Sequence, residues 1–401
     1  MTSFLTALFL CAAANAPLYE QQLVFEPDPK HNHSSSIVET PNGDLLVCWF
    51  HGSGERSSDD VLVAGARKRK GDDKWSAPFI MADTPNLPDC NPVMFVDPRG
   101  TLWLFWVTIQ NNEWGGALLK YRTSTDYAQD GPPKWQWQDV VHCRPLDLED
   151  DFLEAVKQAE IQYAPQLKAD EKMAKGLNEW KTKAKDKLAQ RLGWMPRIHP
   201  ILLGENRIML GLYSDVFNCS IAAFTEDWGE NWTFSQPIIS YELGNIQPAF
   251  VTKKNGDIVA FMRDNGIPKC IRTSVSADHG INWTPTATTA LPNPGSSVDC
   301  VGLKSGSWVL ICNDTQDGRH ILSAYLSEDE GATWIRRRRF ESFIKDQGSG
   351  SYPSLIQAAD GTLHLTYSYV SQEFKGSAIK HVHFDEAWLR DGEQISQPTT
   401  K

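Results

Sequence analysis

The chain has 401 residues, a formal net charge of -11, 41% apolar residues and 22% charged residues. This composition is typical of a globular protein with enough apolar material for a large core. The acidic balance argues against a nucleic-acid partner, because a phosphate backbone requires a clustered basic face. The basic run from Arg336 to Arg339 is typical of a solvated edge.

Residues 1–16, "MTSFLTALFLCAAANA", combine an apolar stretch with a small-residue ending. This pattern predicts a secretory signal peptide cleaved after Ala16, and the alternative is an apolar N-terminus that is packed or disordered. No other stretch is long and apolar enough to span a bilayer. We therefore expect a secreted or periplasmic protein with no membrane span, whose mature part is residues 17–401.

A turn followed by an alternating apolar strand recurs along the chain. It is found in six segments: 42–49 ("NGDLLVCW"), 99–106 ("RGTLWLFW"), 205–212 ("ENRIMLGL"), 255–262 ("NGDIVAFM"), 305–312 ("SGSWVLIC") and 360–367 ("DGTLHLTY"). Period-2 strands joined by tight turns at a repeat of about 50 residues predict an all-β, six-bladed β-propeller. The early segment "QQLVFEP" is predicted to complete the last blade.

A second repeat occurs three times, as "TEDWGENW" at 225–232, "SADHGINW" at 276–283 and "SEDEGATW" at 327–334, with starts 51 residues apart. In each, the aspartate is placed to accept from nearby backbone N–H groups, the glycine to take a positive φ, and the tryptophan to pack against the blade. Asp227, Asp278 and Asp329 are therefore predicted to be structural.

Residues 147–192 interrupt the repeat with a charged segment that has helical apolar spacing. We expect one or two helices inserted between blades. They could be a surface decoration or a lid over the propeller mouth, since functional loops concentrate at such insertions.

The eight cysteines include no CxxC pair, so the sequence supports neither a zinc nor a redox site, and we expect no metal and no cofactor. Cleavage of the signal would leave seven cysteines, so at least one would be unpaired within the chain. Cys48, Cys219 and Cys312 lie in strand-like runs, where a small buried side chain is the simplest interpretation.

The three octets are Asp-boxes, and the chain from Val24 to Phe384 resembles the sialidase (neuraminidase) superfamily, in particular its sialidase-like BNR-repeat proteins. The resemblance implies a glycosidase with a carbohydrate substrate, arginines that bind a sugar carboxylate, a tyrosine nucleophile and an aspartate acid/base. Glycosidases with a tyrosine nucleophile are an exception to the two-carboxylate rule.

Matching residue by residue, Arg263 in "NGDIVAFMR" and Arg319 in "DGRHILSAYLSEDEG" resemble two of the carboxylate-binding arginines. Tyr352 in "GSYPSLIQAADGTL" resembles the nucleophile. In "GERSSDDVLVAGARK", Arg56 and either Asp59 or Asp60 resemble the first-blade segment that holds the acid/base, with Asp59 slightly favoured. Any one of these residues alone would be read as structural.

Two positions depart from the family pattern. His33, in "NHSSS", aligns where the first arginine is expected, and Gln247 lies near the position of the glutamate that partners the tyrosine. Glutamine cannot accept the tyrosine proton as a carboxylate does. His33 could bind a carboxylate if protonated, act as a general base if neutral, or be structural.

Further polar residues are expected near the same mouth: Asn91, Arg197, His199 and Asp299. Asp299 could substitute for the missing carboxylate. Three functions follow: an exo-glycosidase that releases a terminal acidic sugar, sialic acid by default; a hydrolase or lyase acting on uronic-acid-containing polysaccharide ends; and a non-catalytic glycan-binding propeller.

Overall fold

The computed structural model describes residues 16–374 and 376–395. The segment predicted as a signal peptide, residues 1–16, lies outside the described residues except for Ala16. Within the described ranges no helix is long and apolar enough to cross a membrane.

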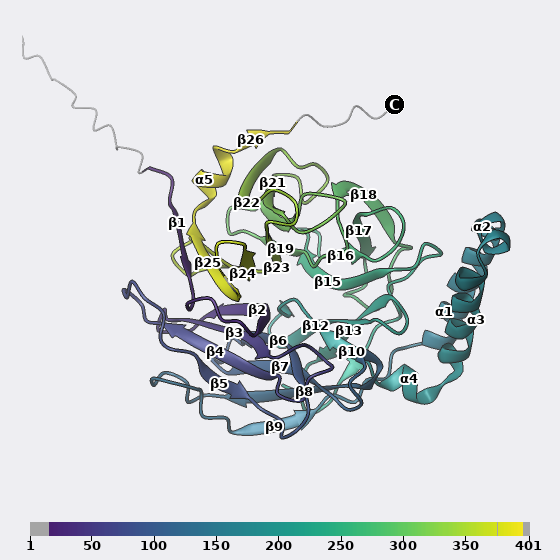
Figure 1. The fold of residues 1–401 in the computed structure, drawn as a ribbon, viewed down its shortest axis with the longest axis horizontal. Coiled ribbons are helices and arrows are strands. Elements are labelled where there is room, and N and C mark those ends of the chain that lie inside the picture. Colours follow the sequence, from purple (N-terminus) through teal and green to yellow (C-terminus); the bar gives the residue numbers. More distant parts are fainter. Residues whose placement is uncertain (1–15, 375, 396–401) are drawn as a thin grey trace, which may run out of the picture.

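Six antiparallel sheets surround a common centre, which confirms the predicted six-bladed propeller (Figure 1). Blade 1 contains β2 (His31–Glu39), β3 (Leu45–Gly52), β4 (Leu62–Lys68) and β5 (Phe79–Ala82); blade 2 contains β6 (Asp89–Val96), β7 (Leu102–Ile109), β8 (Ala117–Ser124) and β9 (Trp137–Val140). Blade 3 contains β10 (Trp194–Pro196), β11 (Ile201–Leu203), β12 (Arg207–Ser214), β13 (Cys219–Thr225) and β14 (Thr233–Phe234).

The second half of the propeller repeats this plan. Blade 4 contains β15 (Asn245–Thr252), β16 (Ile258–Asp264), β17 (Cys270–Ser276) and β18 (Ala287–Pro292); blade 5 contains β19 (Asp299–Gly302), β20 (Trp308–Asn313), β21 (Ile321–Ser327), β22 (Arg336–Ser342) and β26 (Glu393–Gln394). Blade 6 contains β23 (Gly348–Gln357), β24 (Leu363–Ser371), β25 (Ser377–Phe384) and β1 (Tyr19–Leu23). Two short helices lie outside the insertion at 147–192: η1 (Trp114–Gly116) and α5 (Glu386–Arg390).

The repeated turn-and-strand segments become the second strand of each blade, namely β3, β7, β12, β16, β20 and β24. The predicted closure is also confirmed, because β1 pairs antiparallel with β25 from Tyr19↔Phe384 to Leu23↔Lys380. This pairing joins the two ends of the propeller in one sheet, and it covers an edge of β25 that would otherwise expose unpaired backbone groups.

The Asp-box turns have the geometry expected from their residues. In the box at 276–283, Asp278 accepts from the backbone N–H of Asn282 at 2.9 Å and from the hydroxyl of Ser276 at 2.8 Å. Gly280 has φ +87°, and its N–H donates to Ser276 Oγ at 2.9 Å. The other two boxes repeat these contacts around Asp227 and Asp329.

An Asp278→Ala variant is expected to lower the free energy of unfolding by about 1 kcal/mol, because it leaves turn N–H groups without their acceptor at an exposed site. Burial raises the pKa of Asp278, but the hydrogen bonds from Asn282 outweigh it and hold that pKa below its usual value. The stability that the ionised Asp278 contributes is therefore fully present at pH values above the pKa that this residue has in the unfolded chain. It is lost as pH falls through the pKa of Asp278 in the folded protein.

Urea unfolding of the wild type and the variant at about pH 7 and about pH 3 measures both effects. Asp83→Ala is the matched control, because Asp83 is exposed and has no side-chain hydrogen bond in the described part of the chain. Equal stability of the two variants at neutral pH would contradict a structural role for Asp278.

The segment at 147–192 is helical, as predicted, but it contains two long helices and two short ones: α1 (Leu148–Gln162), α2 (Ala164–Ala169), α3 (Glu171–Lys185) and α4 (Lys187–Arg191). The extra breaks have local causes, since a proline lies in the first turn of α2, and Asp170 and Asp186 cap the helices that follow them. The long helices stand at the side of the propeller beside blade 3 rather than across its centre (Figure 1).

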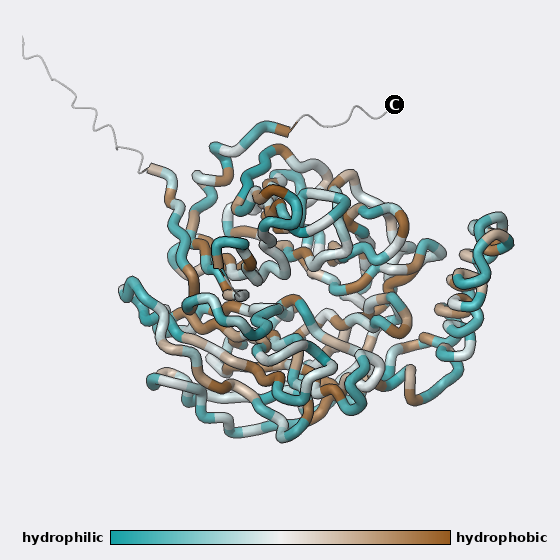
Figure 2. The backbone as a smooth tube through the Cα atoms, viewed as in Figure 1, coloured by the Kyte–Doolittle hydropathy of each residue, from teal (hydrophilic) through white to brown (hydrophobic). Residues whose placement is uncertain are grey.

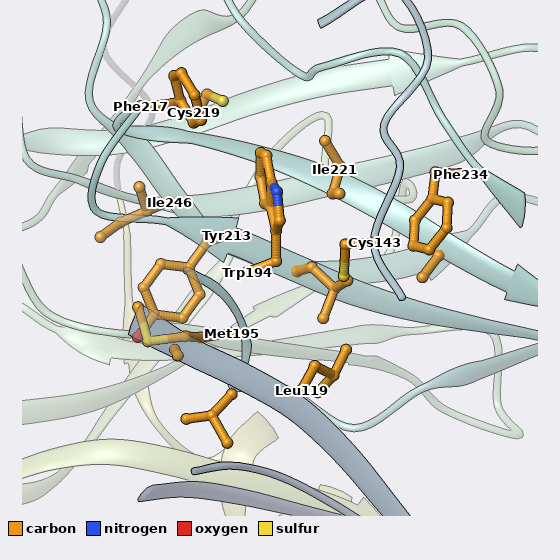
Figure 3. Packing of buried hydrophobic residues seen from close by; sticks show 14 of the residues in the cluster. Leu119, Cys143, Trp194, Met195, Tyr213, Phe217, Cys219, Ile221, Phe234 and Ile246 are labelled. Atoms are coloured by element: carbon orange, nitrogen blue, oxygen red, sulfur yellow. The ribbon is translucent and has the colours of Figure 1, made fainter. Parts of the chain in front are cut away.

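Apolar side chains fill the spaces between neighbouring blades, and hydrophobic stretches follow the inner strands (Figure 2). One cluster joins blades 2 and 3 to the inserted helices; Trp194, Tyr213 and Phe217 lie within it (Figure 3). Phe152 of α1 contacts Phe217 with ring centroids 5.1 Å apart, which anchors the insertion to blade 3. Cys48, Cys219 and Cys312 are buried and unpaired, as expected.

Candidate active site

Four inner strands carry the same irregularity close to the mouth of the propeller. In β2, β6, β15 and β23 the pairing register shifts at a bulge. Each bulge contains a non-glycine residue with positive φ, located nine residues before the turn glycine of its blade: Ser34, Asn91, Gln247 and Tyr352. Such a backbone conformation costs about 1–3 kcal/mol and is concentrated at functional sites. The bulges therefore mark the mouth as a specialised region.

Tyr352 is the centre of the cluster at the mouth. Its side chain is buried, and its hydroxyl oxygen accepts a hydrogen bond from Arg263 Nη1 at 2.8 Å and one from Gln247 Nε2 at 3.4 Å. The ring of His33 lies against the tyrosine ring, with centroids 4.1 Å apart. Residues from blades 1, 4 and 6 thus meet at one phenol.

Two further guanidinium groups lie over the ring of Tyr352. The Cζ of Arg197 is 4.9 Å from the ring centroid and that of Arg319 is 5.1 Å from it. No carboxylate in residues 16–374 and 376–395 forms an ion pair with Arg197, Arg263 or Arg319. The three guanidinium groups therefore gather positive charge at the mouth without an ion pair to any described carboxylate.

Arg197 differs from the other two arginines in its surroundings. It is 1% exposed and donates to the carbonyls of Ser35 at 3.2 Å and Pro353 at 3.0 Å. Burial lowers the pKa of Arg197 to about 10. Through these two hydrogen bonds Arg197 connects the bulges of β2 and β23. Arg263 and Arg319, in contrast, are partly exposed.

The arginines set the protonation states at the centre of the site. Burial alone would raise the pKa of Tyr352, but the charges of Arg263 and Arg319 outweigh it, and the pKa lies below its ordinary value. Burial, followed by the charge of Arg319, holds the pKa of His33 well below its usual range. His33 is therefore a neutral imidazole at neutral pH, and Tyr352 is biased towards phenolate.

Asp299 contacts the backbone of β23, the strand that carries Tyr352. It is fully buried, and its Oδ2 accepts from the backbone N–H of Leu355 in β23 at 2.8 Å and lies 3.6 Å from His199 Nδ1. Burial raises the pKa of this carboxyl group. Asp299 thus connects blade 5 to the strand that carries Tyr352, and no hydrogen bond joins it to the phenol.

Asn91 occupies the blade 2 bulge and is buried. Its amide donates to the hydroxyl of Tyr213 at 3.0 Å, which lies at the end of β12. Burial, together with the charge of Asp215, raises the pKa of Tyr213 well above its usual value. A neutral phenol therefore adjoins Asn91.

The blade 1 loop places its three predicted residues away from direct contact with Tyr352. Asp60 accepts from the backbone and hydroxyl of Ser53 and pairs with Lys30 at 3.0 Å, and the Ser53 hydrogen bonds hold its pKa far below the ordinary value. Asp59 is exposed and accepts from Asn112 at 2.9 Å. Arg56 lies over the ring of Trp114.

Two carboxylates near the mouth were missed by sequence reasoning. Burial raises the pKa of Asp215. The charges of Arg263 and Arg56 act in the opposite direction, but the effect of burial is larger. Glu55 lies 3.7 Å from His31, whose ring is 5.3 Å from that of His33. Asp215 in "LYSDVF" and Glu55 in "HGSGER" each lie just after the second strand of a blade. Arg263 has a similar position, next to the last residue of the second strand of blade 4. That shared position is the signal that could have identified them.

The chain matches one known family. The family described as "BNR repeat-like domain" matches residues 43–165 and 178–365. No curated protein gives a match. A Dyadobacter fermentans protein of unknown function aligns with TM-score 0.68 and 14% identity over 91% of this chain and 98% of its own.

Two glycosidases of known structure share the fold. The intramolecular trans-sialidase from Ruminococcus gnavus aligns with TM-score 0.65 and 11% identity over 92% of this chain and 96% of its own. The α-L-arabinanase of Penicillium chrysogenum aligns with TM-score 0.60 and 14% identity over 94% of this chain and 100% of its own. At these identities the likeness concerns the fold. The family match covers most of the chain, and the protein therefore belongs to the BNR repeat-like domain family.

Proposed function

We propose that the protein is an exo-glycosidase that releases a terminal acidic sugar, with sialic acid as the first candidate. The observation that carries the proposal is the group of three arginines without carboxylate partners around Tyr352. Unpaired guanidinium groups in a buried setting favour an anionic ligand, and a planar guanidinium matches a carboxylate bidentately. The shared fold with a trans-sialidase supports the same class.

Arg263 and Arg319 are the residues we assign to the sugar carboxylate, because both are partly exposed at the mouth. Arg197 is assigned a positioning role, because its Nη1 and Nη2 each donate to a backbone carbonyl and its charge lies over the phenol ring. A neutral phenol or its arginine-balanced phenolate also avoids the repulsion that a carboxylate nucleophile would meet beside an anionic sugar.

In the proposed reaction, the phenolate oxygen of Tyr352 forms a bond to the anomeric carbon while the bond to the glycosidic oxygen breaks. That oxygen leaves with a proton from an aspartic acid. A water molecule, deprotonated by the same carboxylate, then releases the sugar and restores Tyr352. Gln247 cannot accept the tyrosine proton, and the hydrogen bond from Arg263 stabilises the phenolate in place of a carboxylate partner.

Asp59 is the proposed acid/base, because Asp60 is held as a carboxylate by Lys30 and Ser53. An Asp59→Asn variant is expected to lose about 100- to 10,000-fold in kcat/KM on a glycoside with a poor leaving group, and much less on an aryl glycoside that needs no protonation. Asp60→Asn is the matched neighbour and is expected to lose far less. A leaving-group-dependent loss in Asp215→Asn instead would contradict the assignment to Asp59.

The proposal is tested with a panel of chromogenic glycosides that carry a sialic acid, a uronic acid or a neutral sugar. Turnover of the sialoside by the wild type, with none of the neutral glycosides cleaved, is the expected result. Cleavage of neutral glycosides alone would contradict the assignment of the arginines. Saturable binding of the acidic glycosides without product over a long incubation would identify a non-catalytic glycan-binding propeller instead.

A second candidate function has an observation in its favour. His33 is a neutral imidazole packed on Tyr352, and such a pair can abstract a proton α to a carboxylate that the arginines neutralise. A uronic-acid-containing polysaccharide end would then undergo β-elimination, with loss of the proton and departure of the glycosidic oxygen. Ultraviolet absorbance of an unsaturated product separates this lyase reaction from hydrolysis.

A further inference from the structure

A groove of about 570 Å³ lies between blades 2 and 3, outside the candidate active site. Its walls come from the turn between β6 and β7, the strands β8 and β9, and the Asp-box turn at 225–232. Asn91 of the mouth lies near the start of β6, and Arg99 of the groove lies just beyond the end of that strand at Val96; the extended chain from Asn91 to Val96 spans about 17 Å. The groove therefore belongs to the opposite end of the blades.

Aromatic side chains form much of the groove. Trp137 is 58% exposed although it is a large apolar residue, and its indole N–H donates to the hydroxyl of Tyr121 at 3.2 Å. Tyr121 donates in turn to the carbonyl of Gly229 in the Asp-box turn at 3.0 Å. A Cβ at Gly229 would lie 3.0 Å from the Tyr121 oxygen, so this close approach requires glycine. The exposed indole is therefore held in a fixed place.

Trp228 distinguishes this Asp-box from the other two. It has φ +60°, and the residues in the same place of the following boxes, His279 and Glu330, have nearly the same backbone angle. Of these three boxes only this one has a tryptophan there, and the guanidinium Cζ of Arg99 lies 3.8 Å from its ring centroid. All three boxes share the turn conformation, so the turn itself does not require tryptophan at this position.

Polar groups complete the groove. The carboxylate of Asp139 accepts only from the backbone N–H of Val140, at 2.7 Å, and Glu230 has neither a hydrogen bond nor an ion pair with any described residue. Arg99 is already paired with Asp97 at 2.7 Å. The free acceptors are therefore anionic, and they would repel an acidic sugar.

We propose that this groove binds a neutral saccharide, whose C–H face packs on Trp137 and whose hydroxyl groups donate to Asp139 and Glu230. A sugar ring presents slightly positive C–H groups to the negative face of an aromatic ring, and its hydroxyls supply the donors that carboxylates accept. The volume is within the usual range for a small-molecule site. The mouth would then bind an acidic sugar and the groove a neutral one.

Affinity electrophoresis through gels that contain galactan, arabinan, xylan, mannan or glucan tests the proposal, with alginate as the acidic comparison. At least one neutral polysaccharide is expected to retard the wild type, and Trp137→Ala is expected to weaken that binding at least tenfold. His279→Ala removes the ring that stands in the next Asp-box at the position of Trp228, away from the residues that line the groove, and as a control it is expected to behave as the wild type. Circular dichroism establishes that the variants are folded.

A second pair of variants, Asp139→Asn and Glu230→Gln, keeps the shape of the groove and weakens its acceptors, and each is expected to reduce retardation severalfold. The proposal is overturned if no neutral polysaccharide retards the wild type, if Trp137→Ala is retarded as strongly as the wild type, or if alginate binds through Trp137. Retardation requires no turnover, so absence of glycosidase activity would leave this result unaffected.

Discussion

A Tyr352→Phe variant is expected to lose about a thousandfold or more in kcat on the best acidic glycoside, while its KM changes little. The substitution removes only the hydroxyl oxygen, which accepts from Arg263 at 2.8 Å and is the one atom proposed to form a bond to the sugar. The ring remains, so the packing against His33 and the two flanking arginines is preserved. Steady-state kinetics on the wild type and the variant give both parameters.

Tyr369→Phe is the control for general effects of removing a hydroxyl group, because Tyr369 lies in β24 and contacts Phe343 and Lys380 rather than the mouth. Its activity is expected to match the wild type. Turnover of Tyr352→Phe within tenfold of the wild type would exclude the tyrosine as nucleophile and favour a mechanism without a covalent intermediate.

The second large effect is expected at Arg263. An Arg263→Ala variant is expected to lose about 30- to 3,000-fold in kcat/KM, corresponding to the 2–5 kcal/mol typical of truncating one partner of a buried charge contact. The residue is proposed both to bind the sugar carboxylate and to stabilise the phenolate of Tyr352. Arg263→Lys keeps one charge without the planar fork, so an intermediate loss is expected.

The pH profile separates these two roles of Arg263. The charge of Arg263 is the strongest influence that lowers the pKa of Tyr352, so its removal raises that pKa. If the phenolate is the reactive form, activity rises with pH through this pKa, and the rising limb of Arg263→Ala must move to higher pH. Arg339→Ala, which removes an exposed arginine of strand β22, is the matched control. If the activity of Arg263→Ala rises over the same pH range as that of the wild type, Arg263 binds substrate without stabilising the phenolate.

Much of the fold could be predicted because its determinants are local and repeated. The turn glycines, the period-2 strands and the Asp-box residues Asp227, Asp278 and Asp329 each act within a few residues of chain. Repetition at 51 residues then specifies blades, and the early strand at Tyr19–Leu23 completes the last one. The number of inserted helices depended on Pro165 and on the caps at Asp170 and Asp186, which interrupt an otherwise continuous helical pattern.

The candidate site could be predicted where residues keep a fixed distance from a blade turn. Gln247 and Tyr352 each lie nine residues before the turn glycine of their blade, and His33 is adjacent to Ser34, which does the same. The structure brings His33, Gln247 and Tyr352 together with Arg263 and Arg319. The environment of Arg197 depends on carbonyls more than 150 residues away in the chain, and the raised pKa of Asp215 depends on its burial in the folded protein. Neither property has a signature in the local sequence.

The central claim is that Tyr352, in its arginine surroundings, forms a bond to an acidic sugar. Acid quenching during turnover of a sialoside, followed by proteolysis and mass spectrometry, measures this directly. The predicted result is a peptide containing Tyr352 that is heavier by one glycosyl unit and disappears once substrate is exhausted. Product formation with only unmodified Tyr352 peptide at every quench time would contradict the account.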